Sequence, residues 1–184
     1  MKNAVKLICL LLVALLALAG CSKPDLGIVD DVIDAAQDTV SAKAFTNAGV
    51  TMTLTTKFLD FTDTETNDGE YEFLYADEVH CVLALREDKE SLVETFGELN
   101  AQSYGDMIAQ LYEIEAKTEI KDNFATYTYE VANAEDGTKV TFTCVFLETE
   151  QDFWNIQISC PSDQYAANQA SIWSWLTSIQ VAEG

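Results

Sequence analysis

Three stretches of alternating apolar residues follow one another in the C-terminal half of the chain, and they constrain its fold more than any other feature. They read FATYTYEVA, TKVTFTCVFLE and FWNIQISC, and they are separated by Asp136-Gly137 and by the polar tract 149–152. Alternation with a period of two predicts β-strands. Because connections this short join antiparallel neighbours, we predict an antiparallel meander. Across its last hairpin we expect three facing pairs that make one buried face: Cys144 with Ile156, Phe146 with Trp154, and Phe142 with Ile158.

Shorter strand-like stretches come before the meander. AGVTMTLT alternates apolar residues with threonines, and EYEFLYA alternates aromatic residues with other types. Asp68-Gly69, just before EYEFLYA, is typical of a tight hairpin turn because both positions tolerate a positive φ. VHCVLALR has no clearly polar face before Arg86, which predicts a central strand covered on both sides.

Two helices are predicted between these strands and the meander. Ser91 and Glu94 have the spacing of a capping box before LVETFGEL, and Ser103 is placed to cap YGDMIAQLYEIEA. The apolar stripe expected on the second helix consists of Met107, Leu111 and Ile114.

A third helix is predicted after Pro161, over SDQYAANQASIWSWLTSIQ. Its expected buried stripe consists of Tyr165, Ile172, Leu176 and Ile179. Trp173 and Trp175 are two residues apart, so they cannot both point into the sheet. Trp173 falls near the edge of the stripe and is a candidate contact for a partner or ligand, with packing over the sheet edge as the alternative.

The N-terminus has the layout of an export signal. Lys2 and Lys6 precede an uncharged run over 7–20, which is shorter than the roughly 20 apolar residues that cross a membrane. Leu18 to Cys21 reads LAGC and resembles the lipobox of bacterial lipoproteins. The resemblance implies cleavage before Cys21, acylation of its thiol with fatty acids such as palmitate, and anchoring to the cell membrane on its extracytoplasmic side. An ordinary signal peptide that ends in cysteine is the alternative.

The chain is strongly acidic. It has 31 acidic and 10 basic side chains and a formal net charge of −21. The leader contains two of the lysines and no acid, so its removal would leave 8 basic side chains and a charge of −23. This charge repels nucleic acid, so we expect no nucleic-acid partner. It favours cationic partners or divalent ions, or it only keeps the domain soluble outside the cell.

Three segments are expected along the chain: a lipoprotein signal peptide over 1–20, an acidic tether or stalk helix over 21–44, and a single domain over 45–184. The tether contains IVDDVIDAAQDTVSAKA, whose apolar residues have helical spacing with aspartates between them. Its apolar stripe is thin, so partial disorder is the alternative to a helix. The remaining length suits one domain with a two-layer core.

The order of these patterns resembles the PsbP-like superfamily, including DcrB-type bacterial lipoproteins. The resemblance rests on FTNAGVTMTLTTKF, on a strand ending in LALRED, on SYGDMIAQLY, and on the meander that closes with FWNIQISCPSDQYAANQASIWSWLTSIQ. It covers residues 45–180 and implies an α+β fold in which helices flank an antiparallel β-sheet as an α/β/α sandwich. Members of the superfamily act as photosystem accessory proteins, as a regulator of a nuclear-transport GTPase and as envelope lipoproteins, mostly without catalysis. No catalytic motif of the family can be carried over to this chain.

The cysteines and the single histidine are candidate sources of chemistry. Beyond the leader and Cys21, the thiols are Cys81, Cys144 and Cys160, an odd number. Buried free cysteines are the main interpretation, and the sequence leaves open whether a disulfide forms among them. A cysteine nucleophile with His80 as base has little support, and a zinc site lacks the usual ligand spacing.

The acidic run DFTDTETNDGEYE does not match a calcium-binding EF-hand loop. Aligned from Asp63, its glycine falls at position seven instead of six, and position twelve is Leu74 instead of glutamate. A solvated loop explains the acids, while weak calcium binding stays possible. Glycine-rich phosphate loops, GxSxG and HExxH motifs are absent from the sequence.

These patterns predict a lipid-anchored envelope lipoprotein with a non-catalytic binding or accessory domain. We expect no cofactor, no metal and no catalytic residues; the expected partners are the membrane, through the lipid on Cys21, and an unidentified protein or small molecule. The alternatives are an envelope hydrolase that uses acids near His80 and a calcium-binding surface protein.

Overall fold

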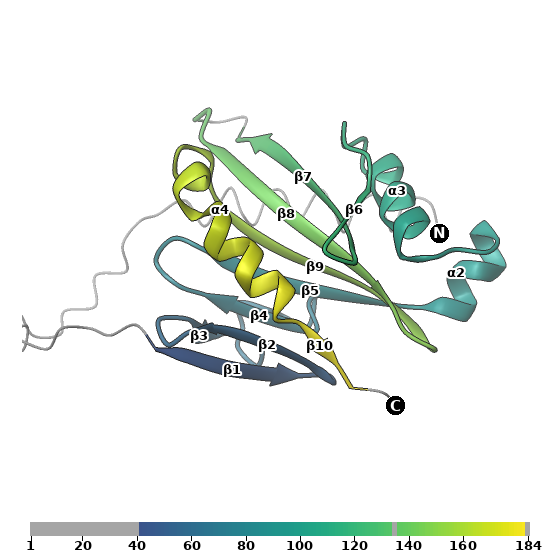
Figure 1. The fold of residues 1–184 in the computed structure, drawn as a ribbon, viewed down its shortest axis with the longest axis horizontal. Helices are drawn as coiled ribbons and strands as arrows, with labels where there is room; N and C mark the ends of the chain where they lie inside the picture. The colour runs from purple at the N-terminus through teal and green to yellow at the C-terminus, as the bar shows by residue number, and fades with distance from the viewer. Residues whose placement is uncertain (1–40, 134–135, 183–184) are drawn as a thin grey trace, which may run out of the picture. The chain divides into compact units, whose positions relative to one another are not determined.

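The computed structural model describes residues 41–133 and 136–182, and these form ten strands and three helices. In chain order the elements are β1 (Ala42–Asn47), β2 (Val50–Thr55), β3 (Leu59–Asp60), β4 (Phe73–Ala76), β5 (Cys81–Asp88), α2 (Lys89–Phe96), α3 (Ala101–Leu111), β6 (Glu119–Lys121), β7 (Phe124–Ala132), β8 (Lys139–Glu148), β9 (Asp152–Pro161), α4 (Ser162–Thr177) and β10 (Gln180–Val181). The strands make a seven-stranded sheet of order β3-β4-β5-β9-β8-β7-β6 and a three-stranded sheet of order β1-β2-β10 (Figure 1). Neighbouring strands are antiparallel in both sheets, so the predicted α+β class is confirmed.

The two faces of the large sheet are covered by different elements. Helix α4 packs on β8 and β9 and also contacts β2 of the small sheet, and the core on this face includes Leu54, Ile156 and Leu176. Helix α3 packs on β7, β8 and β9. Its Tyr104 ring stacks on Phe153, whose side chain points away from that of Ile156 because side chains alternate along a strand. On the α4 face, where the sequence predicts only a helix, the small sheet also contributes core residues such as Leu54.

The sequence pattern does not predict β1 and β10, the outer strands of the small sheet. β1 begins at Ala42, three residues before the expected start of the domain. β10 has only two residues, too few for a periodic pattern, and it is positioned by pairing Gln180 with Thr51 of β2. Residues 1–40, including Cys21 and most of the predicted tether, lie outside the described residues. Within the described part of the chain, no helix is long and apolar enough to cross a membrane.

The predicted meander is confirmed, but the predicted register of its last hairpin is wrong by one residue. Cys144 faces Gln157 instead of Ile156, and Ile156 faces Val145. The four-residue turn sets this register, because the Thr149 N–H donates to the Asp152 carbonyl at 2.9 Å. A shift of one residue in the pairing moves the side chains of a strand to the opposite face of the sheet relative to those of its partner. Three side chains therefore point away from the α4 core, contrary to the predicted pairs: Phe142, Cys144 and Phe146.

Asp68-Gly69 forms a turn with positive φ values of 45° and 73°, but this turn is not the tip of a two-residue hairpin. It lies within a long connection between β3 and β4. Asn67, which is 2% exposed, holds this connection together. Its amide donates to the carbonyls of Thr62 and Tyr71 at 2.8 Å and accepts from the Tyr71 N–H.

The residues that cap the two middle helices lie three positions before the serines predicted to cap them. Asp88 caps α2 by accepting from the Ser91 N–H, and Asn100 caps α3 in a capping box with Ser103. Each serine therefore occupies the third helical position, because a carboxylate or amide oxygen upstream is available as the cap acceptor. The predicted stripe of α3 is also wrong. The buried residues of this helix are Tyr104, Gly105, Ile108 and Ala109.

Candidate functional site

A cleft of about 100 Å³ lies between α4 and the strands β6, β7 and β8. Helix α4 packs over β8 and β9, whereas β7 and β6 continue the sheet toward its edge. The helix supplies four lining residues with spacings of four, three and one, so they share one helix face. The cleft is lined by Glu119, Lys121, Thr126, Tyr127, Thr128, Thr143, Tyr165, Gln169, Ile172 and Trp173.

The floor of the cleft combines apolar groups with hydroxyls. Thr126 and Thr143 are each 4% exposed, and Ile172 is 1% exposed. Thr126 Oγ1 donates to the Cys144 carbonyl at 2.6 Å, while the Thr143 and Tyr165 hydroxyl oxygens are 3.2 Å apart. Because a hydroxyl has one donor and two acceptor positions, this arrangement leaves acceptor capacity for a ligand.

Trp173 forms one end of the cleft, where the turn between β6 and β7 reaches the helix. Its Nε1 donates to Asp122 Oδ2 at 2.7 Å, and the Lys121 ammonium lies 3.9 Å from the centre of its ring. Asp122 and Asn123 have φ values of 47° and 69°, which suits a tight two-residue hairpin turn. Trp173 is therefore half-buried and oriented by a segment 51 residues away in sequence. Its contact with a partner or ligand stays a prediction.

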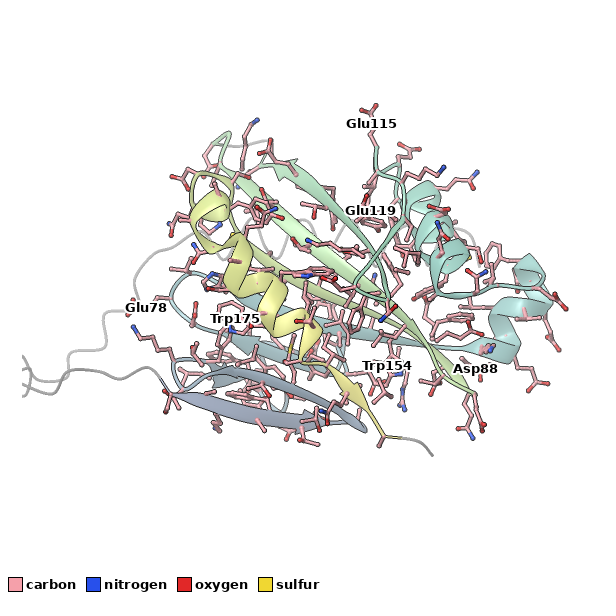
Figure 2. All side chains as sticks on the ribbon, in the orientation of Figure 1. Glu78, Asp88, Glu115, Glu119, Trp154 and Trp175 are labelled. Atoms are coloured by element: carbon pink, nitrogen blue, oxygen red, sulfur yellow. The ribbon has the colours of Figure 1, made fainter. Side chains whose placement is uncertain are left out.

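The rim of the cleft carries exposed polar side chains. Glu119 and Lys121 stand two residues apart on β6, so they share a side of the strand, and Gln169 lies on α4. Figure 2 shows Glu119 at the β6 segment. The rim thus offers one carboxylate, one ammonium and one amide. These groups are suited to holding a polar ligand by hydrogen bonds.

His80 lies elsewhere in the domain, at the turn before β5. Its Nδ1 is 3.1 Å from Asp77 Oδ1, and Asp77 also accepts from the backbone N–H groups of Val79 and His80. Burial opposes ionisation of Asp77, but the hydrogen bonds from His80 and Val79 outweigh it and lower the pKa of this carboxyl. His80 Nε2 is buried with no hydrogen-bond partner, and the ring meets Trp175 edge-on at 4.9 Å. The structure thus places one carboxylate beside His80, whereas the hydrolase alternative requires two or three.

The three cysteines of the described residues are free thiols. Burial raises the pKa of Cys81 to about 11, and it raises the pKa of Cys144 as well. For Cys160, burial and the nearby charge of Asp163 raise the thiol pKa. Thiols with raised pKa values are poor nucleophiles at neutral pH, which argues against cysteine catalysis at these positions.

In residues 41–133 and 136–182, no group of three or more histidine, cysteine, aspartate or glutamate side chains could hold a metal ion. In the acidic run, Asp60 Oδ1 instead accepts from the Thr62 N–H at 3.0 Å. That carboxylate therefore stabilises the start of the connection between β3 and β4.

The sequence pattern singles out Trp173 but not Asp122 and Lys121, the residues that orient it. Asp122-Asn123 between two strand-like stretches is a recognisable turn signal that could have located the hairpin. No local signal links this turn to α4, because the two segments meet only in the folded chain. Cys21, the predicted lipidation site, lies outside the described residues.

Comparison with known proteins supports the fold. No protein-family model matches the sequence, and no curated protein matches it. The solution structure of cyanobacterial PsbP (CyanoP) from Synechocystis sp. PCC 6803 matches with a TM-score of 0.51 and 10% identity, over 81% of this chain and 98% of that protein. A crystal structure from Bacteroides thetaiotaomicron VPI-5482 matches at 14% identity over 73% of this chain and 46% of that one, with a TM-score of 0.47, which is too low to carry an argument. The chain therefore has a PsbP-like fold.

Proposed function

We propose that this protein is a DcrB-type lipoprotein of the bacterial cell envelope, anchored through Cys21 on the extracytoplasmic side of the membrane. The observation that carries the proposal is the sequence Leu18-Ala19-Gly20-Cys21 at the end of an apolar leader. Two or three acyl chains at about 0.8 kcal/mol per buried methylene would hold the domain at the bilayer. The absence of a membrane-spanning helix among the described residues is compatible with a lipid anchor.

The domain beyond the anchor would act as a binding or accessory module, with the cleft beside α4 as its binding site. Support comes from the cleft itself, which brings two aromatic side chains together with hydrogen-bonding groups. The PsbP-like fold alone assigns no activity, so the proposal of a binding function rests on the residues of the cleft. In the described residues, His80 is paired with Asp77 and its second ring nitrogen is enclosed by the fold, which gives no support to a hydrolase.

Lipid labelling of the full chain tests the proposal. Cells that express the protein are fed an alkyne-tagged palmitate, and incorporation is measured together with the mass of the purified protein. We expect the wild-type chain to be labelled and to begin at Cys21, and Cys21→Ala to be unlabelled with its leader retained. Cys81→Ala is the matched control, since it removes a free thiol from the domain and should leave the label unchanged. Equal labelling of wild type and Cys21→Ala would contradict the proposal.

A further inference from the structure

The two aromatic side chains that α4 places at the cleft give its mostly polar lining two ring walls. Tyr165 and Trp173 are half-buried, and Ile172 lies below them in the core. Such walls bind flat apolar surfaces, and tyrosine and tryptophan combine an apolar ring with a polar group. A pyranose ring presents a surface of this kind, because its C–H groups form apolar faces while its hydroxyls project around the edge.

The hydrogen-bonding groups around these walls include both donors and acceptors. Thr128 Oγ1 donates to Thr143 Oγ1 at 3.4 Å, and the Thr143 hydroxyl also meets that of Tyr165. Gln169 adds an amide that both donates and accepts, and Glu119 adds an acceptor. Sugar hydroxyls act as donor and acceptor at once, so a mixed set of this kind suits them better than a set of one polarity.

The charges at the cleft disfavour an ionic ligand. Glu119 and Lys121 balance each other on the rim, and the Lys121 ammonium is already placed over the Trp173 ring. The formal charge of the whole chain, −21, repels anions. The same charge attracts cations, but at the cleft a cation would meet the Lys121 ammonium on the rim, and Asp122 already accepts from the Trp173 indole.

We infer that the cleft beside α4 binds a neutral pyranose ring, as found in an envelope glycan. The inference rests on the proposed function, since an extracytoplasmic anchor places the domain among such glycans. Tyr165 and the face of Trp173 that the Lys121 ammonium leaves uncovered flank the sugar ring, and the hydroxyls of Thr128, Thr143 and Tyr165 with the Gln169 amide hold its edge.

A nuclear magnetic resonance titration tests this inference on the full chain. The protein is labelled at the tryptophan indole nitrogens and kept in a zwitterionic detergent, because a sugar-based detergent would compete. The chain has three tryptophans, and Trp173→Phe assigns the signal of Trp173. The methyl glycosides of glucose, galactose, mannose and N-acetylglucosamine are the neutral probes, and glucuronate and glucosamine are the charged ones. We expect at least one neutral glycoside to shift the Trp173 signal saturably, while the signals of Trp154 and Trp175 stay in place.

Two variants and one matched control locate the binding. Tyr165→Phe removes only a hydroxyl, Gln169→Ala removes an exposed amide with one methylene group, and each should weaken binding about tenfold. Gln164→Ala changes the same residue type on the same helix outside the cleft and should leave binding unchanged. The inference is overturned if none of the neutral glycosides shifts the Trp173 signal saturably, if a charged sugar binds as well or better, or if Gln164→Ala weakens binding as much as Gln169→Ala.

The result can be separated from that of the lipid labelling. The titration reads the indole of Trp173, whereas the labelling reads the mass and acylation of Cys21. If Cys21 is labelled but no sugar binds in the cleft, the lipid anchor is supported and the inference of sugar binding is refuted. If a sugar binds but Cys21 is unlabelled, the inference of sugar binding is supported and the lipid anchor is refuted.

Discussion

The pair formed by buried His80 and partly buried Asp77 links the turn before β5 to helix α4 through the contact of His80 with Trp175. Because hydrogen bonds lower the pKa of Asp77 below its ordinary value of 3.8, the ionised carboxyl stabilises the folded state. This contribution is fully present above pH 3.8 and is lost as the pH falls through the lowered pKa of the folded state. We therefore predict that Asp77→Asn loses about 1–3 kcal/mol of stability at neutral pH.

Denaturant unfolding at neutral and acid pH measures this effect. The loss in Asp77→Asn relative to wild type should shrink as the pH falls below 3.8, because the wild-type carboxyl then becomes protonated too. Glu78→Gln is the control, since Glu78 is the exposed neighbour of Asp77 (Figure 2) and its removal should change stability little. A deficit in Asp77→Asn that stays constant down to strong acid would show that the charge of Asp77 contributes nothing.

Helix α3 approaches the large sheet so closely that Gly105 leaves no room for a methyl group. A Cβ at this position would lie 2.7 Å from both Phe146 Cδ2 and Thr118 Oγ1. Alanine gains about 1 kcal/mol of helix propensity over glycine, but overpacking against a buried ring costs about 1–3 kcal/mol. Because Phe146 is 1% exposed and cannot move into solvent, we predict that Gly105→Ala lowers the free energy of unfolding in chemical denaturation.

Gln110→Ala is the matched control for the helix. Gln110 is exposed on the same helix, so its replacement should be neutral or slightly stabilising. If Gly105→Ala were more stable than wild type, helix α3 could move away from the sheet at little cost. The close packing of α3 on Phe146 would then be refuted.

The elements that could be predicted from sequence are those whose own residues determine them. Alternation located the meander, and period and composition located α4, because burial of one face leaves a local pattern. The register of β8 on β9 could not be predicted, since it depends on hydrogen bonds in the turn at Thr149 and Asp152. Trp173 could likewise be predicted as a contact from its place on the helix, but its hydrogen bond to Asp122 could not be predicted. That bond depends on how α4 and the β6–β7 hairpin pack.

At the scale of the whole molecule, an excess of like charge opposes the folded state. The chain carries 31 acidic and 10 basic side chains, so bringing them together raises their mutual repulsion, which salt screens. Salt also weakens the ion pairs Arg86–Glu72, Lys89–Glu148 and Lys139–Glu130. Partly exposed pairs of this kind contribute only about 0–1 kcal/mol each, so relief of the general repulsion should outweigh their loss.

We therefore predict that the melting temperature rises when sodium chloride is added, by about 4 °C for a gain of roughly 1 kcal/mol in a domain of this size. Calcium chloride at equal ionic strength should give the same rise, because screening depends on the ionic strength of the solution. Thermal unfolding in the two salts measures both effects. A rise at calcium concentrations too low to change the ionic strength would reveal a specific site, because a ligand that binds only the folded state stabilises it by mass action. The acidity of the chain would then serve calcium binding, and the explanation by general repulsion would fail.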